Sequence, residues 1–478
     1  MARWLLAVWL AAGCAQLAGI DDTTGGGGFT LHVTAEYDGA TVVQQPLDVT
    51  GQTATWFQPD AADPTTLDRF AGMQTDTDEW TATGPSGTPA IELTLPDVPV
   101  PFTHLVAAAP ADVTVPELYY GDPSPQLPAA DAAFDVNVTL PTAIAAGEQY
   151  EIDAVGAWAL YGLGAAEAPV GALQIGPITV PYSSFLPNTP SPVAAITAAD
   201  VVVLLRYTGD ALTGVLQIPP FAQTDTGDAL TGTLTEVTAD QTLTATIDPA
   251  TAATRYQALR PTMSGFGVSW GAYASPGASL DSGAGVLVAG GSPLATDTTL
   301  TAMYGNPFTS PSWPVVFEYV TSETRSYTAG GIPISLGAGL YTISDTSAGQ
   351  TFSLPAGLPE LISIDQTPLN TDGMAVTLAA GPVDVRFDAD QPTNTSYELQ
   401  LYDIVVTGTQ ATTTQVFDYV GPSADFTVPP ELFVSGHTYV VRASCVQGGE
   451  PGFATGDLVS RSLPLSVGYF DSAVFTIQ

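Results

Sequence analysis

Residues 29–37 read FTLHVTAEY, and this stretch decides the fold class. Every second residue is apolar (Phe29, Leu31, Val33, Ala35 and Tyr37), and polar or charged residues stand between them. Successive side chains of a β-strand point to opposite faces, so the alternation predicts a strand with one buried and one solvated face. The same alternation recurs at residues 91–95, 134–140, 243–247 and 383–387. These repeated half-buried strands predict an all-β fold of tandem antiparallel β-sandwiches.

Three other stretches break this pattern. The run VVVLLRY at residues 201–207 is apolar without alternation, which predicts a central strand buried on both faces. Short helices are expected after Asp63-Pro64 and Asp248-Pro249, because Asp can cap free amides and Pro suits the first turn. In the second helix, Arg255 would lie towards the negative C-terminal end.

A heptapeptide repeat adds a prediction about strand order. TGDALTG occurs at residues 208–214 and again at 226–232. Gly-Asp pairs favour turns, so the repeat predicts two neighbouring strands that are each entered through such a turn. A cation site formed by Asp210 and Asp228 is the functional alternative, and duplicated turn chemistry explains the repeat more simply.

The charge of the chain excludes several chemistries. The 478 residues include 9 basic and 48 acidic side chains, so the net charge is 9 − 48 = −39, and all the basic residues are Arg. Without Lys there is no Schiff-base catalysis, no G-x-x-x-x-G-K-[ST] phosphate loop and no S-x-x-K serine enzyme. The negative field argues against nucleic acid as a partner. Three His, with no H-E-x-x-H and no C-x-x-C motif, exclude the familiar zinc arrangements.

The N-terminal segment, MARWLLAVWLAAGCAQLAGIDDTTGGGG, reads as an export signal. Arg3 precedes an apolar run, Trp4 to Ala12, which is too short to span a bilayer. The ending AAGC, with Leu10 just before it, resembles the bacterial lipoprotein signal. That resemblance implies a signal peptide of residues 1–13 and acylation of Cys14.

The residues after Cys14 extend this resemblance. By the same resemblance, Ala15 implies delivery to the outer membrane, and the stretch from Cys14 to Asp22 is similar to lipoproteins of myxobacterial type. Residues 14–28 would then comprise the acylated Cys and a flexible Gly-rich tether, with the membrane as a partner through the lipid anchor on Cys14. The alternative is an ordinary secretory signal in which Cys14 is incidental. Cys445 ends an apolar stretch and is expected to be a buried, inert thiol.

A corner motif stands in the last part of the chain. LFVSGHTYVVRA at residues 432–443 follows strand-like segments at 383–387, 397–402 and 425–428. The motif resembles the fibronectin type III family of immunoglobulin-like sandwiches. The resemblance implies that Leu432 packs under the corner and that the Tyr439 hydroxyl bonds to upstream backbone, while Val441 and Ala443 face the core.

The predicted domains are β-sandwiches at 29–128, 129–355 and 356–478. The middle region comprises one domain or two, and the last domain is the fibronectin type III-like one. As a whole the chain is similar to large β-rich lipoproteins of myxobacterial outer membranes.

The sequence contains one nucleophile motif. A G-x-S-x-G sequence is centred on Ser269, and His437 is the only His that follows it. A hydrolase would place this Ser on a strand-to-helix elbow. The surrounding sequence, FGVSWGAY, instead predicts a strand with Phe266, Val268 and Trp270 on one face.

Calcium is the one cofactor with candidate ligands. Asp76, Asp78, Asp388 and Asp390 supply carboxylates in predicted loops, where extracellular modules bind calcium weakly. None of these clusters matches the D-x-[DN]-x-[DN]-G-x₅-E loop, and solvated turns are the alternative.

Aromatic residues near predicted loops suggest a binding face. Exposed rings there would stack on sugars or anchor a protein partner, whereas the competing interpretation buries them in the cores. The residues concerned are Trp56, Phe57, Trp80, Tyr119, Tyr120, Tyr304, Phe308 and Trp313. His32 and His104 are expected to be structural.

The sequence therefore favours a non-catalytic lipoprotein anchored in the outer membrane. It would act in adhesion or interaction at the cell surface or in the envelope, with envelope proteins or glycans as partners. The alternative is a secreted carbohydrate-binding or carbohydrate-active protein. No catalytic residue is assigned.

Overall fold

Strands dominate the molecule. The structure is a computed structural model that describes residues 28–38, 42–94, 103–107, 111–120, 132–155, 157, 159–187, 195–196, 200–218, 228–259, 265–274, 286–291, 296–308, 313–329, 331–345, 350–351, 354–391, 394–408, 410–449 and 463–478. Cys14 and the predicted signal lie outside the described residues. Within these ranges the helical elements are α1 (Pro249–Leu259) and two 3₁₀ turns, η1 (Tyr182–Ser184) and η2 (Pro430–Leu432). The predicted all-β class is confirmed.

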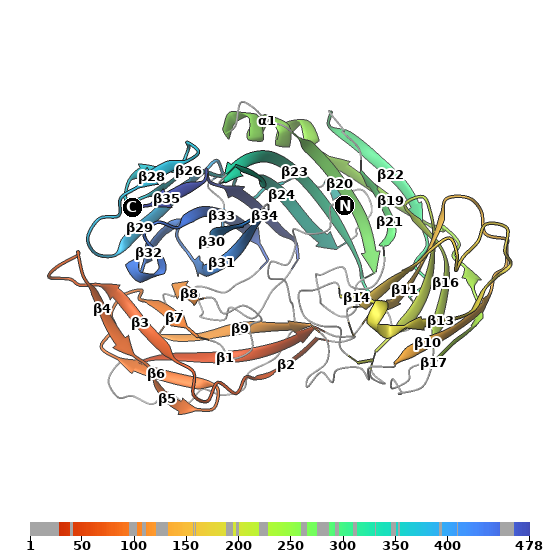
Figure 1. Cartoon of the computed structure of the whole chain (residues 1–478), viewed down its shortest axis with the longest axis horizontal. Helices are drawn as coiled ribbons and strands as arrows, with labels where there is room; N and C mark the ends of the chain where they lie inside the picture. Colours follow the sequence, from red (N-terminus) through yellow and green to blue (C-terminus); the bar gives the residue numbers. More distant parts are fainter. Residues whose placement is uncertain are drawn as a thin grey trace.

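Four β-sandwiches follow one another around an arch (Figure 1). Each has a separate sheet of its own, and the opposing sheet of every sandwich is part of a single 20-stranded sheet, called the shared sheet below. In order around the arch they are the second, third, last and first sandwiches along the chain.

The first sandwich contains the alternating segment at residues 29–37. Its own five-stranded sheet faces four strands of the shared sheet. The separate sheet comprises β1 (Gly28–Asp38), β2 (Val42–Pro46), β5 (Met73–Asp76), β6 (Glu79–Thr83) and β9 (Asp112–Tyr120). The shared-sheet strands are β3 (Ala54–Pro59), β4 (Leu67–Ala71), β7 (Ala90–Leu93) and β8 (Thr103–Ala107). Leu31, Val33 and Ala35 are fully buried between the two sheets, as the alternation predicts.

The helix predicted after Asp63-Pro64 is wrong. Asp63 Oδ1 accepts a hydrogen bond from the Thr65 backbone N–H at 3.0 Å, and the Asp63 carbonyl accepts one from the Thr66 N–H. The side chain thus closes a tight turn rather than capping a helix, and the chain enters β4 directly.

The second and third sandwiches occupy the middle of the chain. In the second, β10 (Ala133–Thr139), β13 (Gln174–Pro181) and β17 (Asp228–Thr233) face β11 (Glu148–Ala154), β12 (Ala159–Leu163), β14 (Leu186–Pro187), β15 (Val202–Thr208), β16 (Ala211–Ile218) and β18 (Thr235–Glu236). In the third, β19 (Gln241–Ile247), β22 (Thr298–Tyr304) and β25 (Gln350–Thr351) face β20 (Phe266–Ala274), β21 (Val286–Gly291), β23 (Val315–Ala329) and β24 (Ile332–Asp345). Each has its own apolar core, and α1 packs against the third.

The last sandwich has two facing sheets. Its separate sheet consists of β26 (Pro359–Ile364), β27 (Thr367–Pro368), β29 (Val383–Ala389) and β32 (Asp425–Val428). Its shared-sheet strands are β28 (Met374–Val376), β30 (Ser396–Thr407), β31 (Gln410–Gly421), β33 (Thr438–Gly448), β34 (Leu465–Asp471) and β35 (Phe475–Ile477).

The predicted corner contacts of this last sandwich are present. The Tyr439 hydroxyl accepts a hydrogen bond from the Val434 backbone N–H at 2.9 Å. Val441 and Ala443 are fully buried in the core, and Leu432 packs against its edge.

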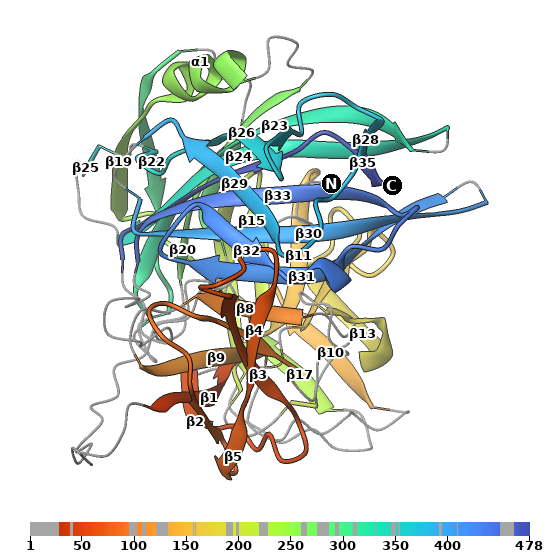
Figure 2. The ribbon, with the colours of Figure 1, turned by 90° about the vertical axis from the view of Figure 1, so that its left-hand side faces the viewer.

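Backbone hydrogen bonds join the sandwiches to one another. β8 runs parallel to β31, with residues 103–106 opposite 417–420, and Figure 2 shows the first sandwich beneath the last at this junction. β24 pairs antiparallel with β34 over residues 338–343 and 465–470, and β16 meets β21 at Ala211 and Val288. The sandwiches are therefore fused through one sheet and are not separated by free linkers.

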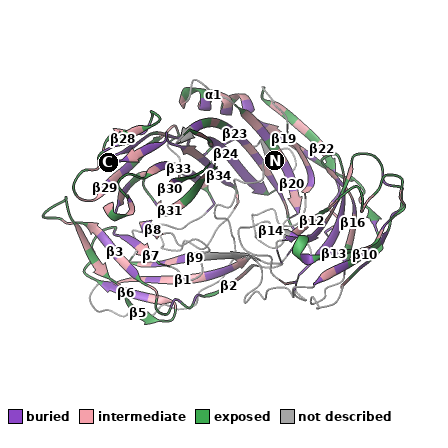
Figure 3. Cartoon of the chain, viewed as in Figure 1, coloured by how far each residue is buried: buried purple, intermediate pink, exposed green. Residues whose placement is uncertain are grey.

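Strands at these junctions are buried on both faces. Val202 and Leu204 of β15 enter the second core, whereas Val203 and Leu205 enter the third. This confirms the prediction made from VVVLLRY. Figure 3 shows the same effect along β24, which is buried continuously from Leu336 to Ser344.

The two copies of the TGDALTG repeat occupy different positions in the structure. In the first copy, Gly209, with φ of +61°, and Asp210 form the two-residue turn between β15 and β16. In the second copy, Asp228 begins β17, which pairs with β10 in the separate sheet. The two strands thus belong to opposite sheets of the second sandwich, where they contact each other across the core without pairing.

The helix predicted after Asp248-Pro249 forms, as α1. Its free Ala250 N–H donates to Asp297 Oδ1 at 3.0 Å, so the capping carboxylate comes from a distant residue. Arg255 extends away from the helix to Asp390 of the last sandwich, with N–O distances of 2.7 and 2.8 Å. It also donates to the carbonyls of Leu354 and Ala356, which ties α1 to the chain entering the last sandwich.

Candidate ligand-binding cavity

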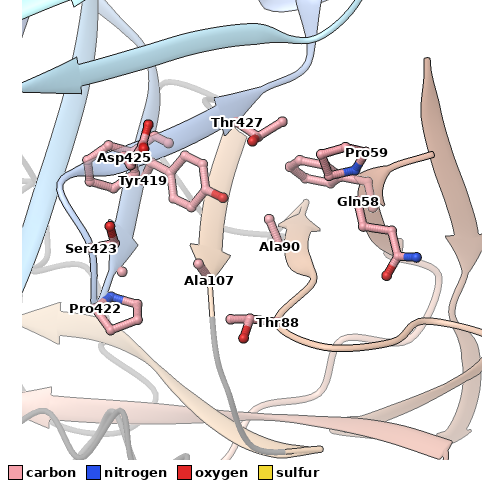
Figure 4. Close-up of a pocket in the computed structure, with 13 residues that line it drawn as sticks. Gln58, Pro59, Thr88, Ala90, Ala107, Tyr419, Pro422, Ser423, Asp425 and Thr427 are labelled. Carbon is pink, nitrogen blue, oxygen red and sulfur yellow. The ribbon is translucent and has the colours of Figure 1, made fainter. Parts of the chain in front are cut away.

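A cavity of about 310 Å³ lies between the first and last sandwiches (Figure 4). Its walls come from β3 and β7 on one side and from β31 and β32 on the other, and β8 lies between them. The parallel pairing of β8 with β31 holds these walls together through the backbone. Thirteen described residues line it: Phe57, Gln58, Pro59, Thr88, Ala90, Ala107, Tyr419, Gly421, Pro422, Ser423, Asp425, Phe426 and Thr427.

The cavity has an apolar interior and a polar rim. The buried lining residues are Phe57, Ala90, Tyr419, Gly421 and Phe426. The exposed lining residues are Pro59, Thr88, Pro422, Ser423 and Asp425. Few polar groups around an apolar interior are typical of small-molecule sites.

Tyr419 supplies a hydroxyl within the buried part of the lining. The residue is 3% exposed, and its ring packs edge-on against Phe426 with centroids 4.8 Å apart. Figure 4 shows the hydroxyl directed from β31 towards the side of the cavity formed by Pro59 and Ala90. In the described part of the chain this hydroxyl has no hydrogen-bond partner. Burial raises the pKa of Tyr419, so the phenol stays protonated and remains a donor.

Asp425 is the one charged residue among the described lining residues, and a cation lies beside it. Arg386 Nη2 is 3.4 Å from Asp425 Oδ1 and 2.5 Å from Asp384 Oδ2. Burial, and then the neighbouring Asp425, raise the pKa of Asp384, while Arg386 opposes that rise. The Arg therefore offsets part of the negative charge at the rim, and Asp425 can accept hydrogen bonds there.

Of the two interpretations of the aromatic residues, burial in the cores is confirmed for the rings whose side chains are described. Trp56, Phe57, Trp80, Tyr304, Phe308 and Trp313 are all buried. They fill the cores because a sandwich interior favours large apolar rings. Of this set only Phe57 lines the cavity. Tyr119 and Tyr120 lie on β9, and their side chains are outside the described residues.

The hydrolase geometry is not formed. Ser269 lies in the middle of β20, opposite Gly291 of β21 and Val320 of β23, and so does not stand on an elbow. This confirms the strand interpretation. His437 belongs to the last sandwich, where its Nδ1 lies 2.8 Å from Asp403 Oδ2.

The four calcium candidates occupy two separate places. Asp76 ends β5 and accepts the Thr77 N–H at 2.7 Å, and Asp78 lies in the adjoining turn. Asp388 lies on β29, and both oxygens of Asp390 are engaged by Arg255. Within the described ranges, no three His, Cys, Asp or Glu side chains are grouped to hold a metal. Calcium binding at these residues stays a prediction.

The other His residues and the second Cys are also placed. His104 of β8 lies 3.0 Å from Asp418 of β31, and both are buried at the junction of the first and last sandwiches. His32 lies on β1 between Glu79 and Asp112, at 3.7 and 3.5 Å. Cys445 is fully buried, as expected, and burial raises the pKa of its thiol.

Sequence reasoning missed Tyr419 and Asp425. The signal that could have pointed to them is the stretch YVGPSADFT at residues 419–427, where a Gly-Pro-Ser turn separates two strands. Nothing in that stretch indicates Phe57 or Ala90, which are distant in the sequence and are brought close by the β8–β31 pairing.

Comparisons with known proteins found no matching protein-family model and no matching curated protein. Among solved structures, one similar chain is a tetra-tandem repeat from the extending region of a large adhesion protein. It is 14% identical, covers 92% of this chain and 99% of that one, and has a TM-score of 0.10. A Salmonella alpha-2-macroglobulin is 9% identical over 93% of this chain and 29% of that one, also with a TM-score of 0.10. Likenesses this weak support no conclusion about function.

A separate observation concerns membranes. No helix in the described ranges combines the length and apolar character needed to cross a bilayer.

Proposed function

We propose that this chain is a non-catalytic binding protein of the bacterial envelope, anchored in the outer membrane by acylation of Cys14. One observation carries the binding role: the shared sheet holds two sandwiches so that their walls enclose a cavity with an apolar interior and a polar rim. The signal-like N-terminus and the net charge of −39 support the location, since a strongly charged surface keeps an exported protein soluble.

The lining chemistry favours binding over catalysis. General acid–base work needs a group whose pKa lies near the working pH. Tyr419 is held protonated because burial raises the pKa of its phenol, and Asp425 faces solvent beside Arg386. The raised pKa of Tyr419 does not suit an acid–base catalyst, whereas the Tyr419 hydroxyl and the Asp425 carboxylate can both form hydrogen bonds that orient a bound molecule.

The last sandwich is proposed to be a fibronectin type III domain. The order β26–β29–β32 facing β31–β30–β33 supports this assignment, as does the Tyr439 hydroxyl bonded to the Val434 N–H. The assignment concerns architecture, because such sandwiches carry many unrelated functions. In this chain the domain supplies one wall of the cavity.

The anchor is tested by comparing the native protein with Cys14→Ser in a Gram-negative host. The native chain is expected to incorporate radiolabelled palmitate and to fractionate with outer membranes, while the Ser variant does neither. Cys445→Ser is the matched control, because it removes the other thiol and should leave both readouts unchanged. Equal membrane partitioning of the native chain and Cys14→Ser would refute the anchor.

The non-catalytic role is tested separately with panels of chromogenic esters and glycosides. No turnover above the rate of a heat-denatured sample is expected. Turnover that is abolished by Ser269→Ala or Asp425→Asn would overturn this part of the proposal.

A further inference from the structure

We propose that the cavity between the first and last sandwiches binds one neutral sugar residue, such as the end of a glycan chain. This inference rests on the proposed binding function and names the ligand class. It starts from Tyr419, whose hydroxyl is within the buried lining and has no hydrogen-bond partner in the described part of the chain. The hydroxyl is directed into the cavity, so its hydrogen is available to a ligand oxygen that would take the place of water there.

The charges of the lining select against ionic ligands. Asp425 is the only charged group among the thirteen lining residues, so an anion would meet a carboxylate and no lining cation. The net charge of −39 adds a repulsive field at longer range. A cation would gain little, because Arg386 already lies 3.4 Å from Asp425.

Polarity across the cavity matches a hydroxylated ring. The Tyr419 hydroxyl can donate a hydrogen bond to a ligand. A sugar hydroxyl or ring oxygen has a lone pair that accepts this bond, whereas an ammonium group has none. At the rim, Asp425 and the Thr88 and Ser423 hydroxyls accept hydrogen bonds from sugar hydroxyls. Pro59 and Pro422, which are exposed in the lining, provide apolar surface for the C–H groups of the ring.

The size of the cavity limits how much of a glycan it holds. Its volume of about 310 Å³ is at the lower end of the range for small-molecule sites. Because the rim residues Thr88, Pro422 and Ser423 are exposed, the rest of a longer chain would extend into solvent. A terminal or branch residue is therefore the expected epitope.

The test uses the full-length chain carrying Cys14→Ser, so that lipid and detergent are absent. Saturation-transfer NMR and calorimetry would be run with methyl glycosides of glucose, galactose, mannose and N-acetylglucosamine. Tetramethylammonium and acetate serve as the cationic and anionic probes. Binding of at least one glycoside, and of neither ion, is expected.

Two variants locate the binding. Tyr419→Phe keeps the ring and removes one hydrogen bond, so it should weaken binding by about three- to tenfold. Ser423→Trp adds a large side chain at an exposed rim position and should abolish binding without unfolding the chain. Tyr397→Phe is the matched control, since it removes a hydroxyl from the same sandwich outside the lining and should leave affinity unchanged.

Other outcomes separate the sugar inference from the membrane anchor. Glycoside binding that both variants leave intact places the sugar site elsewhere, and binding of tetramethylammonium or acetate alone refutes the sugar class. If no probe binds to the Cys14→Ser chain while the native chain incorporates palmitate, the sugar inference fails and the anchor stands. If glycosides bind to the Cys14→Ser chain while the native chain incorporates no palmitate, the anchor is refuted and the cavity assignment stays in place.

Discussion

The ion pair between Arg442 and Asp471 provides a sharp test of how the shared sheet is stabilised. Arg442 on β33 lies opposite Asp471 on β34, and two N–O contacts of 2.7 and 3.0 Å join them. Asp471 also accepts the Gly337 N–H of β24 at 2.8 Å, which links the last sandwich to the third. The Arg442 guanidinium lies over the Tyr469 ring, 4.8 Å from its centroid.

The expected loss follows from burial. The Asp471 side chain is 2% exposed and that of Arg442 is 17% exposed. Arg442→Met would leave the Asp471 carboxylate buried without its cation. Removing one member of a buried pair costs about 3–5 kcal/mol, because the other charge is left desolvated without compensation. Adding Asp471→Asn to Arg442→Met should recover most of the loss, since Asn is neutral and still accepts the Gly337 N–H.

The assay is urea unfolding followed by far-UV circular dichroism, with the denaturant slope checked for constancy. Arg325→Met is the matched control, because Arg325 pairs with Asp372 at 2.8 Å but the two side chains are 32% and 39% exposed. An exposed pair contributes about 0–1 kcal/mol. Equal losses for Arg442→Met and Arg325→Met, or no recovery in the double variant, would refute the reasoning.

Three further predictions concern single side chains. Tyr439→Phe removes the acceptor of the Val434 N–H and should lower the free energy of unfolding by about 1–2 kcal/mol in urea titrations; an unchanged midpoint would contradict the corner's role. Burial raises the pKa of Glu318 above its usual 4.5, so the native chain should lose stability as pH rises from about that value through the folded-state pKa. The stability of Glu318→Gln relative to the native chain should therefore be greater at pH 8 than at pH 4. Melting curves that show the reverse would contradict the expected direction of the pH dependence. In the Cys14→Ser chain, Cys445 should resist iodoacetamide until urea unfolds the protein, because it is fully buried; labelling of the native form, detected by mass spectrometry, would contradict its placement.

Local sequence patterns predicted individual strands well. Alternation at residues 29–37 and the continuous apolar run at 201–207 depend only on which faces of a strand are buried. The run is buried as predicted, and so is the apolar face of the first strand, but Glu36 on the face expected to be solvated is 1% exposed. Asp63-Pro64 and Asp248-Pro249 look alike in sequence, yet only the second begins a helix. The difference is tertiary, because α1 packs against the third core and its free Ala250 amide is capped by Asp297.

The sequence patterns did not predict how strands from distant segments pair. The parallel contact of β8 with β31 and the antiparallel contact of β24 with β34 join strands whose apolar patterns are compatible with many partners. The cavity depends on the β8–β31 pairing. No local sequence feature therefore indicates that Phe57 and Tyr419 line it. For a related reason, a position near a predicted loop did not determine whether an aromatic ring is exposed. A ring there can still belong to the end of a buried strand.

The charge and the shared sheet have a joint consequence. A sheet of 20 strands presents edges that could pair with other copies of the chain, and natural proteins oppose such pairing with charged side chains. At a net charge of −39, with every cation an Arg, two copies repel each other over distances comparable with the Debye length. The same field repels anionic ligands and draws cations to the whole surface without selecting any one site. Selectivity in the cavity would therefore come from shape and hydrogen bonding. The Tyr419 hydroxyl and the apolar lining supply these two properties for the proposed uncharged, hydroxylated ligand.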